Sequence, residues 1–232
     1  MNVRAGGNQT IPRPDHVRPG ADPWWLDAGD RVPSLDVMVE RIRAFESSSH
    51  LRTEEFSQQW VAGARRSAVL VALFDSDDGP CVILTKRANH LRNHRGEISF
   101  PGGRVEEGES VREAALREAE EEIALPPGRV RLTGELDALT TFVSNSLIVP
   151  VVGTVDAFDP IMLRADPGEV DEVIVVPVSE LLRGDTYRNE WWSTPRGDMN
   201  IHFFHLDTET IWGATARILR QLIEVTMTGA DS

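Results

Sequence analysis

Apolar residues recur every three or four positions in three segments of the chain, the spacing that places them on one face of a helix. The first segment follows Ser34, a residue type that often caps a helix, and the last runs from Trp212 to Thr226. The third ends near Leu125, and shorter helices are expected over 53–60 and 179–183. The apolar positions of the three longer segments are Leu35, Met38, Ile42 and Phe45; Ala115, Leu116, Ala119 and Ile123; and Ala214, Ile218, Leu222 and Val225.

Runs rich in β-branched and other apolar residues predict a sheet. Residues 67–74 and 81–87 are two such runs, and the turn formers between them indicate a hairpin. A second hairpin is expected from 187–193 and 201–206, joined by turn residues 195–198, and further strand candidates are 130–137, 147–155 and 172–178. Strands interrupted by a few helices predict an α/β or α+β fold, a sandwich with a mixed sheet between helices.

Length and composition fit one globular domain with an N-terminal extension, since 232 residues with 41% apolar content can bury a sizeable core. Residues 1–22, rich in Gly, Pro, Arg and Asn, are expected to be flexible. Residues 23–60 are expected to form a helical extension, and 61–232 the main domain. The leading segment, residues 1–60, could cap the sheet, cover the site or make a homodimer contact.

The single cysteine, Cys81, excludes an internal disulfide, and its apolar neighbours indicate a buried strand. We therefore expect a reducing, cytoplasmic environment. No apolar run approaches the length of a membrane span, and the N-terminus has no hydrophobic signal core, so no membrane partner is expected. The net charge of -13 argues against nucleic acid as a main partner.

Basic residues concentrate in one stretch of this acidic chain. Residues 82–104 contain one acidic side chain, Glu97, and five basic ones: Lys86, Arg87, Arg92, Arg95 and Arg104. His90 and His94 could add positive charge, whereas a zinc site on this pair is disfavoured because no cysteine lies near. Because arginine suits phosphate oxygens, an anionic ligand is indicated, with Arg87, Arg92, His94 and Arg95 as candidate contacts. The alternative is that these arginines pair with the acidic helix that follows.

That helix carries Glu118, Glu121 and Glu122 at positions three and four apart, where helical side chains are neighbours. Like charges at this spacing repel each other, and Glu120 adds to them. The carboxylates are therefore either solvated on an exposed face or neutralised by a divalent cation. Oxygen-rich clusters suit Mg²⁺ or Mn²⁺ better than zinc.

The segment from Gly103 to Leu125 resembles the Nudix box, a signature of fixed glycine, glutamate and arginine positions. The one departure is Ala124, where the family usually has a glycine that ends the helix in a left-handed conformation. The resemblance implies an α/β/α Nudix sandwich with a mixed sheet. The positions that fall on the signature in register are Gly103, Glu109, Arg117, Glu118, Ala119, Glu121, Glu122 and Leu125.

Residues 83–103 are similar to a second motif, which marks Nudix enzymes that cleave coenzyme A. Ile83 replaces the usual leucine at its start. This resemblance implies hydrolysis of coenzyme A or its derivatives to 3′,5′-adenosine diphosphate and 4′-phosphopantetheine. The matching positions are Leu84, Thr85, Arg87, Ala88, Arg92, Gly96, Phe100, Pro101, Gly102 and Gly103.

The resemblance also implies roles for individual residues, with Mg²⁺ or Mn²⁺ as cofactor. Glu118, Glu121 and Glu122 would bind the metal together with the backbone carbonyl of Gly102. Arg117 would orient Glu121 through an i,i+4 contact and meet Glu109. Glu169 is the candidate for a further acidic group, with Asp171 and Glu172 behind it, and Glu169 competes with Glu118 for the role of general base.

Other functions remain open at this point. One is a Nudix pyrophosphatase that acts on another nucleoside diphosphate derivative, such as ADP-ribose or NADH. Another is a non-catalytic binding module, which retention of all three carboxylates disfavours. Trp191, Trp192 and Phe142 could stack on an adenine, although aromatic residues at strand spacing more often belong to a core or an interface.

Overall fold

The computed structural model describes residues 4–7, 9–28, 31–46, 65–91, 95–141, 145–156, 162–194 and 197–228. Several sequence predictions fall elsewhere. The short helix expected over 53–60, the candidate ligand contacts Arg92 and His94, and the candidate stacking residue Phe142 lie outside the described residues.

The main sheet is mixed and has strand order β4-β3-β2-β8-β6. Strand β2 (Arg65–Ser76) pairs in parallel with β8 (Ser146–Val155) and antiparallel with β3 (Gly79–Arg87), which confirms the first predicted hairpin. Strands β6 and β7 pair antiparallel with β8, β4 and β9 with β3, and β5 with β2. Their bounds are Ile98–Ser99 (β4), Gly102–Arg104 (β5), Val130–Glu135 (β6), Leu139–Thr141 (β7) and Val170–Pro177 (β9).

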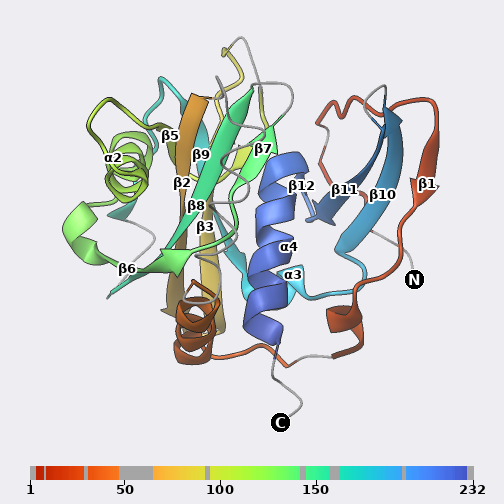
Figure 1. The fold of residues 1–232 in the computed structure, drawn as a ribbon, viewed down its shortest axis with the longest axis horizontal. Coiled ribbons are helices and arrows are strands. Elements are labelled where there is room, and N and C mark those ends of the chain that lie inside the picture. Colours follow the sequence, from red (N-terminus) through yellow and green to blue (C-terminus); the bar gives the residue numbers. More distant parts are fainter. Residues whose placement is uncertain are drawn as a thin grey trace.

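Helices cover both faces of this sheet, as Figure 1 shows. Helix α2 (Val111–Ile123) packs on one face, and α4 (Gly213–Met227) on the other. A helix over residues 35–46 packs with the α4 side, because Met38 and Ile42 belong to the core cluster of that face. The α/β/α sandwich with a mixed sheet, expected from the sequence, is confirmed.

Alternation along β2 divides the core into two clusters. Ala68, Leu70 and Ala72 join the cluster under α2, whereas Val71 and Leu73 join the one under α4. Successive residues of a strand point to opposite faces, so a nearly continuous apolar run is what a strand covered on both sides requires. Cys81 is buried in the α2 cluster, as its apolar neighbours predicted.

A second, smaller sheet lies beyond α4, with strand order β1-β10-β11-β12. It contains the second predicted hairpin, since β10 (Tyr187–Thr194) and β11 (Gly197–His205) pair antiparallel. The remaining strands are β1 (Val17–Pro19) and β12 (Thr210–Trp212), and the short helices are η1 (Trp24–Ala28), η2 (Pro127–Arg129) and α3 (Val178–Leu181). The inner face of the small sheet completes the α4 cluster through Tyr187, Phe204 and Ile211.

The leading segment has partners that the sequence did not predict. Strand β1 pairs with β10, Gln9 Nε2 donates to Glu209 Oε2 at 2.5 Å, and Arg4 is ion-paired with Glu180. These contacts join residues of the leading segment to the small sheet and to α3. Their sequence gave no sign of this, because the partners come from the far end of the chain.

None of the helices in the described part of the chain is long and apolar enough to cross a membrane.

Candidate metal and diphosphate site

Helix α2 presents the three glutamates because its opposite side is anchored. Ala114, Ala115, Ala119 and Ile123 are buried against the sheet, and the small alanines allow a close approach to β2. A capping box fixes the start of the helix: the Glu113 backbone N–H donates to Ser110 Oγ at 3.2 Å, and the Ser110 N–H donates to Glu113 Oε2 at 2.9 Å. The S-x-x-E spacing was readable from the sequence.

Glu122 is the most buried of the three, with 3% of its surface exposed. The Gly102 N–H donates to Glu122 Oε2 at 3.1 Å, and Arg87 Nη1 lies 3.8 Å from Oε1. Burial raises the pKa of Glu122 to about 7, against the lowering effect of the Gly102 hydrogen bond and the Arg87 charge. A carboxyl group with a pKa near 7 is partly protonated at neutral pH, so it releases a proton when it binds a cation.

Glu118 lies next to a backbone that leaves room for its carboxylate. A Cβ atom on Gly103 would lie 2.4 Å from Glu118 Oε1, so only glycine fits there without moving the carboxylate. Burial is the largest influence on the Glu118 pKa and raises it, while Arg117 lowers it. The charge of Glu169 raises the pKa of both Glu118 and Glu122, which brings this loop residue into the electrostatic environment of the helix.

Arg117 connects the carboxylates to the loop that precedes the helix. Its guanidinium contacts Glu109 at 2.9 Å, Glu118 at 3.1 Å and Glu121 at 3.0 Å, and it donates to the Arg104 carbonyl at 3.0 Å. The contacts predicted for Arg117 with Glu121 and Glu109 are both present. The hydrogen bond from Arg117 is the main cause of the lowered pKa of Glu109.

The carboxylates are not gathered into a metal cluster in this geometry. Within the described residues, no three acidic, histidine or cysteine side chains are grouped closely enough to hold a metal ion. The reason is that Arg117 engages Glu118 and Glu121, and the Glu121 side chain is 60% exposed. The candidate donors nevertheless fit a hard divalent cation, because all of them are oxygens. Gly102 and Gly103 beside them have no side chains that would occupy the space.

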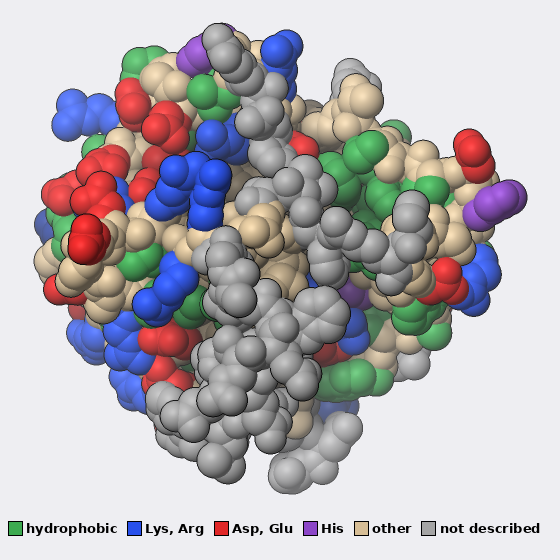
Figure 2. All heavy atoms as spheres, turned by 45° about the horizontal axis from the view of Figure 1, so that its top comes forward, with side chains coloured by type: hydrophobic (Ala, Val, Ile, Leu, Met, Phe, Trp, Pro, Cys, Tyr) green, Lys and Arg blue, Asp and Glu red, His purple; other side chains and the backbone are tan. Residues whose placement is uncertain are grey.

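Acidic and basic side chains lie next to one another on the face of the molecule shown in Figure 2. Of the predicted phosphate contacts, Arg87 reaches Glu122, whereas Arg95 donates from Nε to the Leu91 carbonyl at 2.6 Å and is exposed. Lys86 is ion-paired with Glu209, and His90 Nε2 lies 3.2 Å from the Gly168 carbonyl oxygen. Among the members of this group that the structure describes, Arg87 contacts a predicted metal ligand, and this contact is the pairing with the acidic helix that the sequence left open as the alternative.

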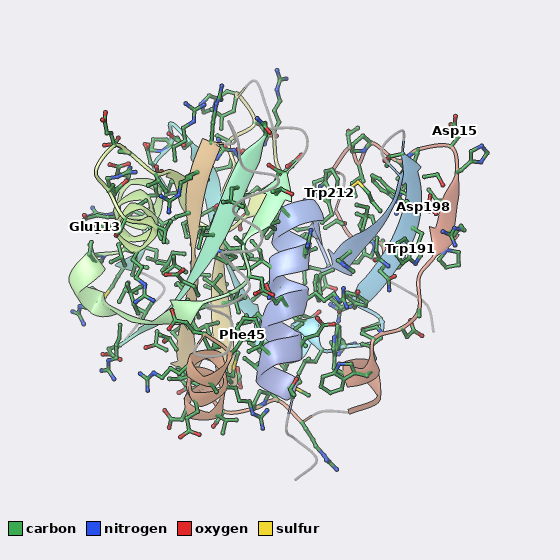
Figure 3. The ribbon with its side chains drawn as sticks, in the orientation of Figure 1. Asp15, Phe45, Glu113, Trp191, Asp198 and Trp212 are labelled. Carbon is green, nitrogen blue, oxygen red and sulfur yellow. The ribbon has the colours of Figure 1, made fainter. Side chains whose placement is uncertain are left out.

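The tryptophans predicted as alternative adenine contacts belong to the small sheet. Trp192 is buried, donates to Glu190 at 2.9 Å and packs near Trp212. Figure 3 places Trp191 in the small sheet, on the far side of the molecule from Glu113 of α2. Trp192 is therefore a core residue, which was the alternative to adenine stacking.

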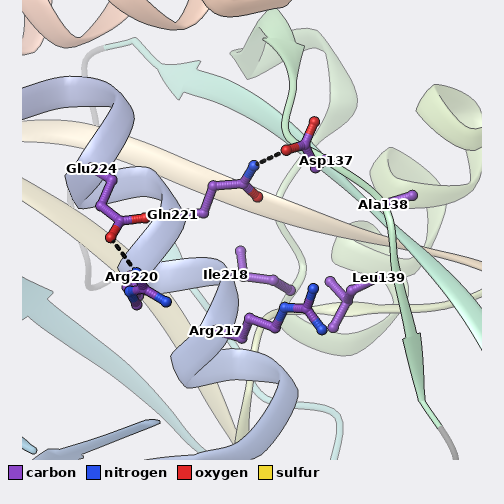
Figure 4. Close-up of a pocket in the computed structure, with 8 residues that line it drawn as sticks. All are labelled: Asp137, Ala138, Leu139, Arg217, Ile218, Arg220, Gln221 and Glu224. Atoms are coloured by element: carbon purple, nitrogen blue, oxygen red, sulfur yellow. Dashed lines mark hydrogen bonds and ion pairs between the residues drawn. The ribbon is translucent and has the colours of Figure 1, made fainter. Parts of the chain in front are cut away.

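A cavity of about 160 Å³ lies apart from these carboxylates, between α4 and residues 137–139 (Figure 4). Four of its polar groups pair with one another, since Gln221 donates to Asp137 at 2.8 Å and Arg220 pairs with Glu224 at 2.6 Å. None of the predicted site residues that the structure describes lines it.

Comparison with known proteins identifies the family. The NUDIX domain family matches residues 64–195, which is more than half of the chain. The chain belongs to the Nudix family. It is 36% identical over 166 residues to the uncharacterized Nudix hydrolase NudL of Yersinia enterocolitica, covering 70% of this chain and 82% of that protein.

Plant Nudix hydrolases are similarly related. Nudix hydrolase 15, mitochondrial, of Arabidopsis thaliana is 39% identical over 173 residues, which cover 70% of this chain and 59% of the relative. Nudix hydrolase 22, chloroplastic, from the same plant is 37% identical over 201 residues, covering 80% and 65%. The chain thus spans less than two thirds of each plant relative.

Among solved structures, a MutT/nudix family protein from Enterococcus faecalis aligns with a TM-score of 0.47 and 17% identity, covering 85% of this chain and 76% of that one. Nudix hydrolases use divalent metal ions, which the oxygen donors described above fit. The choice of metal, the oligomeric state and the cellular compartment stay predictions.

Proposed function

We propose that this Nudix hydrolase cleaves the diphosphate of coenzyme A or its derivatives, giving 3′,5′-adenosine diphosphate and 4′-phosphopantetheine. The observation that supports this substrate is the coenzyme A motif in residues 83–103. The contact between Arg87 and Glu122 places that motif beside the Nudix box. It joins a residue of the coenzyme A motif to a residue of the Nudix box. An arginine in this place can contact substrate phosphate while the carboxylates beside it hold the metal.

The proposed metal ligands are Glu118, Glu121, Glu122 and the carbonyl of Gly102, with Mg²⁺ or Mn²⁺ as the ion. The ion would supply charge neutralisation and lower the pKa of a bound water. To serve as ligands, Glu118 and Glu121 turn from the Arg117 guanidinium, which retains Glu109 as partner. In the present conformation the Glu118 carboxylate occupies the space that the missing side chain of Gly103 leaves open.

The reaction itself needs little covalent chemistry from the protein. Water adds to one phosphorus while the bond from that phosphorus to the bridging oxygen breaks, and two phosphate monoesters leave. The proton of the water passes to a carboxylate, for which Glu169 and Glu118 remain the two candidates. Arg87, Arg92, His94 and Arg95 are the proposed phosphate contacts, and they would hold the diphosphate in line for attack.

A substrate panel tests this proposal. Purified protein with Mg²⁺ is given coenzyme A, an acyl-coenzyme A, ADP-ribose and NADH, and the products are separated and quantified. We expect coenzyme A or its acyl derivative to have the highest kcat/KM. A hundredfold preference for ADP-ribose or NADH would refute the proposed substrate but not hydrolysis, and no turnover of any compound would indicate a binding module.

A further inference from the structure

Strand β9 contains an irregularity at the point where it approaches the site. Lys86 of β3 pairs with Glu172, but the next residue, Arg87, pairs with Val170. Asp171 is therefore an extra residue on β9, a β-bulge. Bulges bend a strand and change which way the following side chains point, and they are frequent beside active sites.

The bulged residue holds a second segment in place. Asp171 Oδ2 accepts hydrogen bonds from the Asn89 backbone N–H at 3.1 Å and from Asn89 Nδ2 at 2.6 Å. Next to this contact, the Ala88 N–H donates to the Glu169 carbonyl at 2.9 Å. The segment after β3 and the Glu169 loop are thus joined by backbone and side-chain bonds together.

The other end of the Glu169 loop is attached to helix α2. The Asp166 N–H donates to the Glu122 carbonyl at 2.8 Å, and the N–H groups of Glu169 and Val170 both donate to the Asp166 carbonyl, at 3.0 and 2.8 Å. Glu169 therefore lies between two fixed points, the end of the metal-ligand helix and the Asn89–Asp171 contact. Its charge reaches Glu118 and Glu122 from this place.

We propose that Asp171 and Asn89 are positioning residues that hold the Glu169 carboxylate toward the metal site. The inference rests on the proposed function, since it requires Glu169 to act there. Both donors to Asp171 come from Asn89 and reach the same oxygen, Oδ2, so this carboxylate joins the β9 bulge to the segment after β3. Residues that orient a ligand in this way commonly change metal affinity or activity by 10- to 100-fold when removed.

Two substitutions of Asp171 distinguish a positioning role from a direct role in the reaction. Asp171→Asn keeps an oxygen that accepts from Asn89 but loses the charge, whereas Asp171→Ala loses both. We expect Asp171→Ala to lower kcat roughly tenfold or more and to raise the Mg²⁺ concentration for half-maximal rate by a similar factor, with KM changed less than about threefold. Asp171→Asn should stay within about threefold of wild type in all three quantities.

Asn89→Ala and the double variant test whether the two residues act as one unit. If they do, Asn89→Ala together with Asp171→Ala is no slower than Asp171→Ala alone. The matched control is Asp156→Ala. Asp156 is an exposed aspartate directly after β8, its Oδ2 accepts from Arg131 at 2.7 Å, and the variant should keep the wild-type rate. Asp171 and Asn89 are also exposed, so melting temperatures should change little.

Each result decides a separate claim. Wild-type kinetics for Asp171→Ala would refute the positioning role, and an Asp171→Asn variant as slow as Asp171→Ala would mean that the charge acts directly. Glu169→Gln with an unchanged rate would remove both the role of Glu169 and that of Asp171. If the wild type prefers another diphosphate, the proposed substrate fails, and the same comparison of variants is decided on the preferred compound.

Discussion

Glu122 combines burial with a place beside other acidic groups, and these two influences act in the same direction. Both disfavour the charged carboxylate, so the pKa rises to about 7 even though Gly102 and Arg87 contact its two oxygens. A divalent cation reverses this balance, because it favours the ionised form. We therefore expect a bound ion to favour ionised Glu122 over its protonated form.

A substitution of Glu121 distinguishes a metal-ligand role from a structural role most clearly. Its side chain is 60% exposed, and its contact to Arg117 is a surface ion pair, so Glu121→Gln should leave the melting temperature nearly unchanged. We expect kcat at saturating Mg²⁺ to fall at least a hundredfold. Glu120→Gln, on the adjacent exposed position of the same helix, is the control and should keep its rate. Near-normal turnover by Glu121→Gln would contradict the ligand assignment.

Gly103 tests the space around Glu118. In Gly103→Ala, the new methyl group would lie 2.4 Å from a Glu118 carboxylate oxygen, and the flexible side chain must move away. The fold should survive while kcat drops by about tenfold or more through loss of ligand geometry. Gly128→Ala, where an added methyl meets open space, is the matched control. Equal rates for both variants would show that the Glu118 position does not matter.

At the scale of elements, helix α2 ends in a conformation that its sequence does not favour. Ala124 has φ 55°, in the left-handed region, where a side chain is strained and glycine is not. The helix is nevertheless well terminated, because the Ala124 N–H donates to the Glu120 carbonyl at 3.0 Å. The departure from the Nudix signature therefore carries a local strain in this protein.

Replacement of this residue should relieve that strain. We expect Ala124→Gly to raise the free energy of unfolding by about 1 kcal/mol, measured by urea denaturation. Ser110→Ala, at the other end of the same helix, removes the capping hydrogen bond and should lower it by about 1 kcal/mol. A destabilised Ala124→Gly protein would mean that the left-handed conformation is not strained.

The sequence predicted the elements better than their arrangement. The helices over 35–46 and α4 and the hairpin of β2 and β3 followed from local periodicity, which needs no knowledge of distant partners. The sequence did not predict a separate small sheet, because the choice of strand partner depends on tertiary packing. The bulge at Asp171 also has no local signal: it exists only in the register between β3 and β9.

The site was predicted in part for the same reason. The spacing of Glu118, Glu121 and Glu122 was readable, as were the partners of Arg117. The depth of Glu122 and the hydrogen bonds that join Asp171 to Asn89 were not, because they arise from segments far apart in the chain. Arg92 and His94 lie outside the described residues and stay predictions.

At the scale of the whole molecule, two buried histidines of the small sheet make the stability of the fold depend on pH. Arg220 can only donate, so His202 Nε2 accepts its hydrogen bond at 3.2 Å, and Nδ1–H then donates to the Tyr187 oxygen at 2.8 Å. Neutral His202 satisfies both contacts. Burial, helped by Arg220, lowers the pKa of His202 to about 3, and burial lowers that of His205 to about 4.

These shifts make the fold sensitive to acid. Both folded-state pKa values lie below the value of about 6.5 expected for an unfolded chain, so their stabilisation is complete above that pH and is lost as the pH falls. As the pH falls from about 6 to 4, protonation of each histidine should lower the free energy of unfolding by about 1.4 kcal/mol per pH unit. Glu122, whose pKa is raised, acts in the opposite sense over pH 7 to 4.5.

The difference between wild type and His202→Asn isolates one histidine, because the other groups titrate alike in both proteins. Urea denaturation at pH 7.5, 6.5, 5.5 and 4.5, values chosen at roughly one-unit steps across this window, gives the two profiles. We expect the variant to be less stable at pH 7.5 and its profile to be flatter on acidification. Parallel profiles would mean that His202 is not held neutral by the fold.

The central claim is that a divalent ion binds among the α2 carboxylates beside Gly102, and crystals grown with Mn²⁺ test it most directly. Anomalous diffraction from Mn²⁺ should give a peak within bonding distance of Glu118, Glu121 and Glu122 oxygens, with Glu118 turned away from Arg117. Crystals of Glu121→Gln should lose or weaken it. A wild-type map with no anomalous peak there, and with Glu118 and Glu121 still bound to Arg117, would contradict the account.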